Sequence, residues 1–259
     1  MPDSPVPSPA ARLLVVVNDP ESGPGHLAGW LVAAGVEFDV RFGAHGTLPA
    51  VDELDAYDGM IALGGGFMPD DTARAPWLVH EAGLVDRCLA DGIPLLGICL
   101  GCQLLAQVAG GRVAAATGAP EKGSTPITMT EAAASDPLFR DLPRTTRFIE
   151  SHVDRITSLP QDAVVLAGSA VLDFQAFRIG ERAWGVQFHP EHEGPDAMGR
   201  WNAESLAALG FDKDALIARA QVEQPATEAA ARTLVLAFTA LAEARARARR
   251  GTEGAQSEP

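Results

Sequence analysis

The chain has 259 residues, of which 26 are glycine and 47% are hydrophobic, so it can bury a sizeable core without disulfides or structural metals. The net charge of -14 argues against binding to a nucleic-acid backbone, and 3 cysteines are too few for a secreted disulfide framework. Because the sequence begins without the basic and apolar segments of a signal peptide, and no apolar run reaches the ~18 residues of a membrane span, we predict a cytoplasmic protein.

The first half of the chain alternates between strand and helix patterns. Residues 1–11, which precede it, are rich in proline and serine and predict a disordered tail. Uninterrupted aliphatic runs are typical of strands buried on both faces, and apolar residues at helical spacing are typical of the helices between them. We expect strands over 13–17, 36–42, 59–63 and 94–98, and helices over 24–34, 76–91 and 100–109. This order predicts an α/β fold with an open, mostly parallel sheet and helices on both faces.

The second half contains short strands without long helices between them, which indicates a small antiparallel extension of the sheet. These strands are expected over 127–130, 147–150, 163–167, 174–179 and 183–188. Two helices are expected to follow, one over 213–220 and a longer one over 227–249. We predict one domain over 12–250, with C-terminal helices within 195–250, and a disordered tail over 251–259.

Cys99 follows a predicted strand and directly precedes a predicted helix. Gly97 and Gly101 flank it and allow the backbone to crowd into an abrupt turn, which is the arrangement of a nucleophile elbow. The N–H of Leu100 would then point toward the place where an oxyanion forms. An isolated cysteine is more often a buried core residue, but the flanking glycines favour a nucleophile here.

A thiol nucleophile needs a base, and the base needs an orienting acid. His189 and Glu191 lie two residues apart at the end of a predicted strand, so their side chains share a face, and Pro190 fixes the backbone between them. Glu191 could hold the imidazole in the tautomer that accepts the proton of Cys99. We therefore predict Cys99, His189 and Glu191 as a catalytic triad; a surface turn with incidental charges is the alternative for the last two.

Four short segments carry a more specific signal when they are taken together. They are Leu63-Gly64-Gly65-Gly66, Gly97-Ile98-Cys99-Leu100-Gly101-Cys102-Gln103, Glu150-Ser151-His152-Val153-Asp154 and Gln187-Phe188-His189-Pro190-Glu191. In order and spacing they resemble the motifs of class I, triad-type glutamine amidotransferases, and the resemblance extends from about Leu13 to Glu193.

This resemblance implies a flavodoxin-like α/β fold and hydrolysis of the glutamine side-chain amide through a γ-glutamyl thioester, with release of ammonia. It makes Cys99 the nucleophile, His189 the general acid and base, and Glu191 the residue that orients it. It further implies oxyanion donors at Gly65 and Leu100 and substrate binding by Gln103, Ser151, Val153 and Asp154.

The resemblance implies no cofactor for the glutaminase step. We also predict no metal site, because Pro190 prevents the helix that would place His189 and His192 on one face as ligands. No segment resembles a fused synthetase domain, so the chain is most similar to the free-standing branch related to the glutaminase domain of GMP synthase. Its substrate would then be glutamine, with ammonia passed to a separate synthetase, or a γ-glutamyl peptide that it hydrolyses.

Two hypotheses of another class remain open. Cys99 and Cys102 form a Cys-x-x-Cys pair, as in a thiol–disulfide oxidoreductase, although a redox pair would not need His189 or Glu191. The other hypothesis is a non-catalytic protein that keeps the fold and binds a partner or a metabolite.

Overall fold

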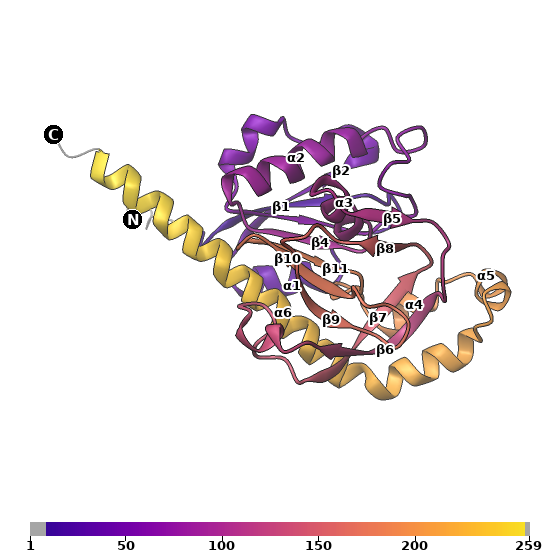
Figure 1. Ribbon diagram of the computed structural model, residues 1–259. Helices are drawn as coiled ribbons and strands as arrows, with labels where there is room; N and C mark the ends of the chain where they lie inside the picture. Colours follow the sequence, from indigo (N-terminus) through magenta and orange to yellow (C-terminus); the bar gives the residue numbers. More distant parts are fainter. Residues whose placement is uncertain (1–8, 257–259) are drawn as a thin grey trace, which may run out of the picture.

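The computed structural model describes residues 9–256 (Figure 1). Of the two predicted tails, residues 1–8 and 257–259 lie outside the described residues. Ala10 and Ala11 already contact the folded domain, since the Ala10 N–H donates to the Gly35 carbonyl at 3.1 Å and Ala11 is buried. The last helix continues to Gln256, beyond the predicted limit at residue 250.

Most strands of the described residues belong to one large sheet. Its members are β1 (Arg12–Val17), β2 (Glu37–Phe42), β3 (Gly59–Ala62), β4 (Leu95–Ile98), β6 (Glu121–Met129), β7 (Thr145–His152), β9 (Val164–Gly168), β10 (Ala176–Ile179) and β11 (Ala183–Val186). Their order is β2-β1-β3-β4-β11-β10-β9-β6-β7. Pairs from β2 to β11 in this order are parallel, and pairs from β11 to β7 are antiparallel. A separate antiparallel pair joins β5 (Arg112–Ala114) and β8 (Arg155–Ser158).

Helices cover both faces of the large sheet (Figure 1). The α-helices are α1 (His26–Ala33), α2 (Leu78–Asp91), α3 (Leu100–Val108), α4 (Pro195–Met198), α5 (Ala203–Ala208) and α6 (Lys213–Gln256), and short 3₁₀ helices span Gly43–His45, Val51–Ala56 and Ala132–Ser135. The side chains of β1 alternate between the two layers: Leu13 faces the core under α1 and α6, and Leu14 faces the core under α2 and α3. None of the helices in the described part of the chain is both long and apolar enough to cross a membrane.

The predicted α/β class and its mostly parallel sheet with helices on both faces are confirmed. The expected antiparallel extension is continuous with the parallel strands through β11. The sequence patterns did not predict β5 and β8, because both strands are short and carry few apolar residues at the spacing of a buried strand.

The two helices predicted over 213–220 and 227–249 are instead one helix, α6, with Pro225 inside it. Proline removes a backbone donor and costs about 3 kcal/mol within a helix, which is why the sequence predicted a break. Packing on both sides of the proline offsets this cost: Ala220 is buried against Ile149 on one side, and Leu234 is buried in the main core on the other. Continuous burial of one helix face therefore outweighs the local preference of Pro225.

The turn from β4 into α3 requires glycine at two positions. A Cβ on Gly101 would overlap the carbonyl of Ala62 in β3, and a Cβ on Gly97 would overlap the backbone of Gly101. Because both obstacles are backbone atoms of packed elements, they cannot rotate away as a flexible side chain could. The two glycines thus set how closely α3 approaches the sheet.

We predict that Gly101→Ala lowers the free energy of unfolding by about 1–3 kcal/mol or more, as overpacking of a core does. Urea denaturation of the two proteins measures this change. Gly29→Ala in α1 is the matched control, because Gly29 is also helical but nothing lies within 4 Å of its added Cβ; its stability should stay equal or rise. Equal stability of Gly101→Ala and wild type would contradict the close approach.

Candidate active site

Three neighbouring strands end at the same edge of the sheet. β4 lies between β3 and β11, and its residue Gly97 is opposite both Ala62 and Gly185. Glycines 64–66 follow β3, Cys99 follows β4 and His189 follows β11, and all of them line one cleft of about 600 Å³. Ligands of open α/β sheets bind at this edge. Folding therefore brings together segments that are far apart in the sequence.

Cys99 has a backbone conformation that residues with a side chain rarely adopt. Its φ is 51° and its ψ is −105°, a conformation that costs about 1–3 kcal/mol and persists only where the surroundings enforce it. The Cys99 N–H donates to the Val186 carbonyl at 2.8 Å, and the Gln103 N–H donates to the Cys99 carbonyl at 2.9 Å. The residue as a whole is 7% exposed. The abrupt strand-to-helix turn predicted from the flanking glycines is present.

His189 contacts Glu191 and flanks Cys99. Its Nδ1 lies 2.7 Å from Glu191 Oε1, and because a carboxylate only accepts, Nδ1 carries the proton. A Cβ placed on Gly64 would lie 3.0 Å from His189 Cε1 and 3.4 Å from Cys99 Cβ, so imidazole and thiol border the same glycine. His189 Nε2 is buried without a hydrogen-bond partner among the described residues. It is the nitrogen that remains available for chemistry in the cleft.

The charges around His189 favour its protonated form. Burial opposes a positive charge, but the negative charges of Glu191 and Cys99 outweigh it and hold the pKa of His189 well above its usual value. His192 differs, since burial and the charge of His189 lower the pKa of His192 to about 4. His192 Nδ1 accepts a hydrogen bond from the Gly194 N–H at 2.9 Å. His192 is therefore a neutral acceptor that holds the loop after Glu191.

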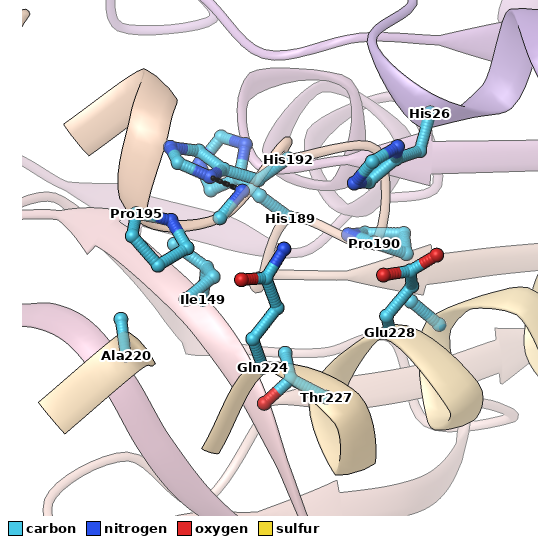
Figure 2. A pocket seen from close by; sticks show the side chains of 12 residues that line it. His26, Ile149, His189, Pro190, His192, Pro195, Ala220, Gln224, Thr227 and Glu228 are labelled. Atoms are coloured by element: carbon cyan, nitrogen blue, oxygen red, sulfur yellow. Dashed lines mark hydrogen bonds between the residues drawn. The ribbon is translucent and has the colours of Figure 1, made fainter. Parts of the chain in front are cut away.

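Backbone hydrogen bonds from two elements fix the loop that carries His189 and Glu191. The Ile149 carbonyl of β7 accepts from the His189 N–H at 2.8 Å, and the Glu191 carbonyl accepts from the His26 N–H of α1 at 2.9 Å. α6 packs against the same loop, as Figure 2 shows for a small pocket lined by His189, Pro190 and His192 on one side and by Gln224, Thr227 and Glu228 on the other. The position of the histidine thus depends on a strand and two helices.

The predicted oxyanion donors Gly65 and Leu100 are neighbours at the cleft. A Cβ on Gly65 would lie 3.0 Å from Leu100 Cδ2 and 2.9 Å from Asn18 Cβ. Asn18, directly after β1, donates through Nδ2 to the Leu63 carbonyl at 3.2 Å and to Glu81 Oε1 at 3.1 Å. The sequence patterns did not reveal this buried network. It fixes the start of the glycine loop through the hydrogen bond from Asn18 to the Leu63 carbonyl.

The predicted substrate-binding residues take different positions. Ser151 of β7 lines the cleft with Cys99, whereas Gln103, Val153 and Asp154 are not among the described residues that line it. Gln103 is buried in α3, and its Nε2 donates to the Asp154 carbonyl at 3.4 Å and to Gln187 Oε1 at 3.1 Å. Gln103 therefore connects the segment that carries Asp154 to α3.

A buried polar cluster lies beside the cleft, and sequence analysis did not predict that it joins His152 to Glu121 and Gln175. His152 Nδ1 is 3.0 Å from the Asp154 carbonyl, and His152 Nε2 is 3.1 Å from Glu121 Oε2. Gln175 Nε2 donates to the same Glu121 oxygen at 2.6 Å. Burial and the charge of Glu121 raise the pKa of Glu150 well above its usual value, which favours the neutral form of this carboxyl. The sequence signal for it was the motif segment that contains Glu150 and His152, whereas Glu121 in β6 and Gln175 directly before β10 lie outside that segment.

Glu121, Glu150 and His152 also form the one group of potential metal ligands within the described ranges, with ligand atoms within 4.8 Å of one another. Two of its members, His152 Nε2 and Glu121 Oε2, lie 3.1 Å apart. Neither His189 nor His192 belongs to such a group.

The sequence matches known proteins over the segment that builds this site. The family model of glutamine amidotransferase class-I matches residues 30–201. A glutamine-hydrolyzing GMP synthase subunit of Methanococcoides burtonii is 42% identical over 157 residues, which are 60% of this chain and 76% of that protein. Gamma-glutamyl peptidase 3 of Arabidopsis thaliana is 30% identical over 165 residues, 61% of this chain and 64% of the peptidase. A GMP synthase of Porphyromonas gingivalis is 43% identical over 131 residues, which are 49% of this chain. The chain spans only 24% of the length of that synthase.

Solved structures agree with the fold. A glutamine amidotransferase from Thermotoga maritima has a TM-score of 0.78 and 26% sequence identity, with 88% of this chain and 98% of that chain covered. The matched fold and segment define an α/β amidotransferase domain. The chain belongs to the class I glutamine amidotransferase family.

The buried carboxyl of Glu81 on α2 belongs to the network that contacts the glycine loop through Asn18. Its Oε1 accepts from Asn18, and its Oε2 is buried without a partner among the described residues. Burial, opposed by the hydrogen bond from Asn18, raises the pKa of Glu81 from 4.5 to about 7. In the unfolded chain the carboxyl ionises near its ordinary value, so folding keeps a proton on Glu81 that the unfolded chain releases.

We therefore predict that the stability contributed by this proton is complete below about pH 4.5 and is lost as pH rises toward about 7. Glu81→Gln should remove this dependence. The unfolding free energy of wild type minus that of the variant should therefore decrease as pH rises from about 4.5 to about 7. Urea denaturation at several pH values measures it. Glu181→Gln, on an exposed turn, is the control and should leave the pH dependence unchanged; an identical profile for Glu81→Gln would contradict the buried proton.

Proposed function

We propose that the chain hydrolyses the side-chain amide of glutamine through a γ-glutamyl thioester. The Cys99 thiolate attacks the amide carbon and forms the C–S bond, while the carbonyl oxygen becomes an oxyanion. His189 gives its Nε2 proton to the amide nitrogen, the C–N bond breaks, and ammonia leaves. Neutral His189 then takes a proton from water, hydroxide attacks the thioester, and the C–S bond breaks. Cys99 returns to thiolate and His189 to imidazolium, and the carboxyl proton passes to ammonia in solution.

The observation that carries this proposal is the 2.7 Å hydrogen bond from His189 to Glu191 beside a strained Cys99 in the same cleft. Glu191 holds the imidazole so that Nε2 remains free to serve the thiol and the leaving group. Proton transfer by such a group contributes about 10²–10⁴-fold to a rate. The family match over residues 30–201 supports the same reaction class.

The backbone N–H groups of Gly65 and Leu100 are our candidates for the oxyanion donors. They belong to elements that the glycine contacts hold close together, and a donor of this kind contributes about 10²–10³-fold to turnover. Ser151 and the backbone of Val153 and Asp154 are our candidates for binding the amino-acid end of the substrate. Gln103 supports them through its hydrogen bond to the Asp154 carbonyl.

The name of the Methanococcoides relative, a glutamine-hydrolyzing component of GMP synthase, supports transfer of ammonia to a separate synthetase. The peptidase from Arabidopsis favours a second candidate function, hydrolysis of γ-glutamyl peptides. Comparing kcat/KM for glutamine and for several γ-glutamyl peptides separates the two, because specificity is the ratio of these values. The chemistry needs Cys99 reduced and no cofactor, which is consistent with a reducing compartment such as the cytoplasm.

The surroundings of Cys102 argue against the redox hypothesis. Its side chain is fully buried, and burial raises the pKa of Cys102 well above its usual value. Cys102 packs in the core under α2 and α3, whereas Cys99 belongs to the opposite core and lines the cleft. The second thiol of a redox pair must be accessible to a substrate thiol, and the buried Cys102 is not.

We predict that Cys99→Ala abolishes both turnover of glutamine and covalent labelling by a glutamine analogue with an electrophile in place of the amide. Cys102→Ala should keep both, because only Cys99 faces the cleft. Ammonia release and intact-protein mass measure the two properties. Labelling also reports on the site if turnover requires a partner. Substantial turnover by Cys99→Ala would reject the mechanism, and loss of activity in a folded Cys102→Ala would revive the redox hypothesis.

We predict that Glu191→Gln lowers kcat by about 100-fold or more, since the imidazole loses its anionic partner. Because Glu191 raises the pKa of His189, the variant should also lose activity at a lower pH on the alkaline side of its profile. Glu193→Gln, at the exposed rim of the cleft, is the matched control and should change neither property. An unchanged kcat and pH profile in Glu191→Gln would exclude Glu191 from this role.

A further inference from the structure

Lys122 is a half-buried cation beside the cleft, and it has no ion pair among the described residues. It lies in β6 directly opposite Ser151 of β7, and its Nζ donates to Ser151 Oγ at 3.1 Å. Ser151 in turn lines the cleft with Cys99. Burial lowers the pKa of Lys122, while the negative charge of Cys99 opposes this shift. The Lys122 ammonium thus lies next to Ser151, on the side of the cleft that β7 forms.

Burial of the Lys122 ammonium is costly, because among the described residues it has lost water without gaining a carboxylate in direct ion-pair contact. The Ser151 hydroxyl provides one acceptor for three N–H donors. Nearby carboxylates are already engaged: Asp154 Oδ1 accepts from the Ala116 N–H at 2.8 Å, and Glu121 Oε2 accepts within the buried cluster. Lys122 therefore has the charge and the donors to take an anion from the cleft.

Lys122 reaches the cleft through Ser151, whereas Arg200 is among the described residues that line the cleft directly. Arg200 lines the rim, its side chain is 73% exposed, and it lies 3.6 Å from the carboxylate of Glu193. An exposed and paired arginine gains little from a second anion. Of these two cations, Lys122 should bind a carboxylate more tightly, because it is less exposed and has no ion pair among the described residues.

We propose that Lys122 binds the α-carboxylate of the γ-glutamyl substrate and thereby selects substrates in which that carboxylate is free. The inference rests on the proposed function, which places the γ-carbonyl carbon at Cys99. The α-carboxylate is the one anionic group of glutamine at neutral pH, and it lies at the opposite end of the side chain from the amide. Ser151 Oγ accepts from Lys122 and can donate its own hydrogen to the same carboxylate.

This assignment defines a substrate class. Free glutamine and γ-glutamyl peptides keep the α-carboxylate and are accepted. A glutamine residue inside a polypeptide carries an uncharged amide at that position, so it leaves the ammonium unpaired and is rejected. Lys122 is then a specificity-determining residue with no role in bond breaking.

The test compares alkylation of Cys99 by three reagents: a chloroketone analogue of glutamine, the same chloroketone without its α-carboxylate, and iodoacetamide. In the wild-type protein, the chloroketone with the α-carboxylate should alkylate Cys99 faster than the chloroketone without it. Lys122→Met should slow it by about 10- to 100-fold, the effect of losing a hydrogen bond to a charged group, while the other two rates stay within about twofold. Lys122→Arg keeps the charge and should restore part of the rate.

The controls separate the competing explanations. Equal reaction with iodoacetamide shows that Lys122→Met is folded around Cys99, and Arg200→Met should leave the preference for the carboxylate intact. Equal slowing of all three reagents in Lys122→Met would mean that the lysine acts on the thiolate, and the proposal would be wrong. A preference that survives in Lys122→Met would also overturn it. Wild-type Cys99 that reacts with neither chloroketone would contradict the proposed function itself, and this inference with it.

Discussion

The close approach of α3 to β3 and β4 is the constraint on which the site depends. Only glycine fits at Gly97 and Gly101, because added Cβ atoms would overlap backbone. This approach forces the chain to turn within one residue, and that residue, Cys99, takes a positive φ of 51°. Packing of the two glycines therefore supports the strain at Cys99 and aims its side chain into the cleft. Stability and chemistry are coupled at this point of the fold.

Parallel pairing supplies the second condition. β11 lies beside β4, so the loop after β11 brings His189 to Cys99 although the two residues are far apart in the chain. The loop is anchored by β7 and by the first turn of α1, and Glu191 then gives the imidazole one defined donor direction. The negative charge of Glu191 favours the imidazolium form of His189 in a setting where burial alone would neutralise the histidine.

The parts that local patterns determine were predictable from the sequence. Aliphatic runs identified β1, β3 and β4, and the glycines beside Cys99 predicted the turn that the structure contains. What depends on tertiary contacts was not predictable. The register between β6 and β7 places Glu121 opposite His152 and Lys122 opposite Ser151, and no periodicity encodes that pairing. Likewise, the packing that carries α6 through Pro225 is visible only once the sheet is in place.

The central claim is that Cys99 and His189 act together on a γ-glutamyl carbonyl held at the glycine loop. A crystal structure of the protein after reaction with a diazoketone analogue of glutamine tests this directly. We predict a bond to Cys99 Sγ, with the ketone oxygen in hydrogen-bonding distance of the N–H groups of Gly65 and Leu100 and with His189 Nε2 facing the new bond. An adduct on another residue, or one on Cys99 whose oxygen points away from both N–H groups and whose imidazole stays distant, would contradict it.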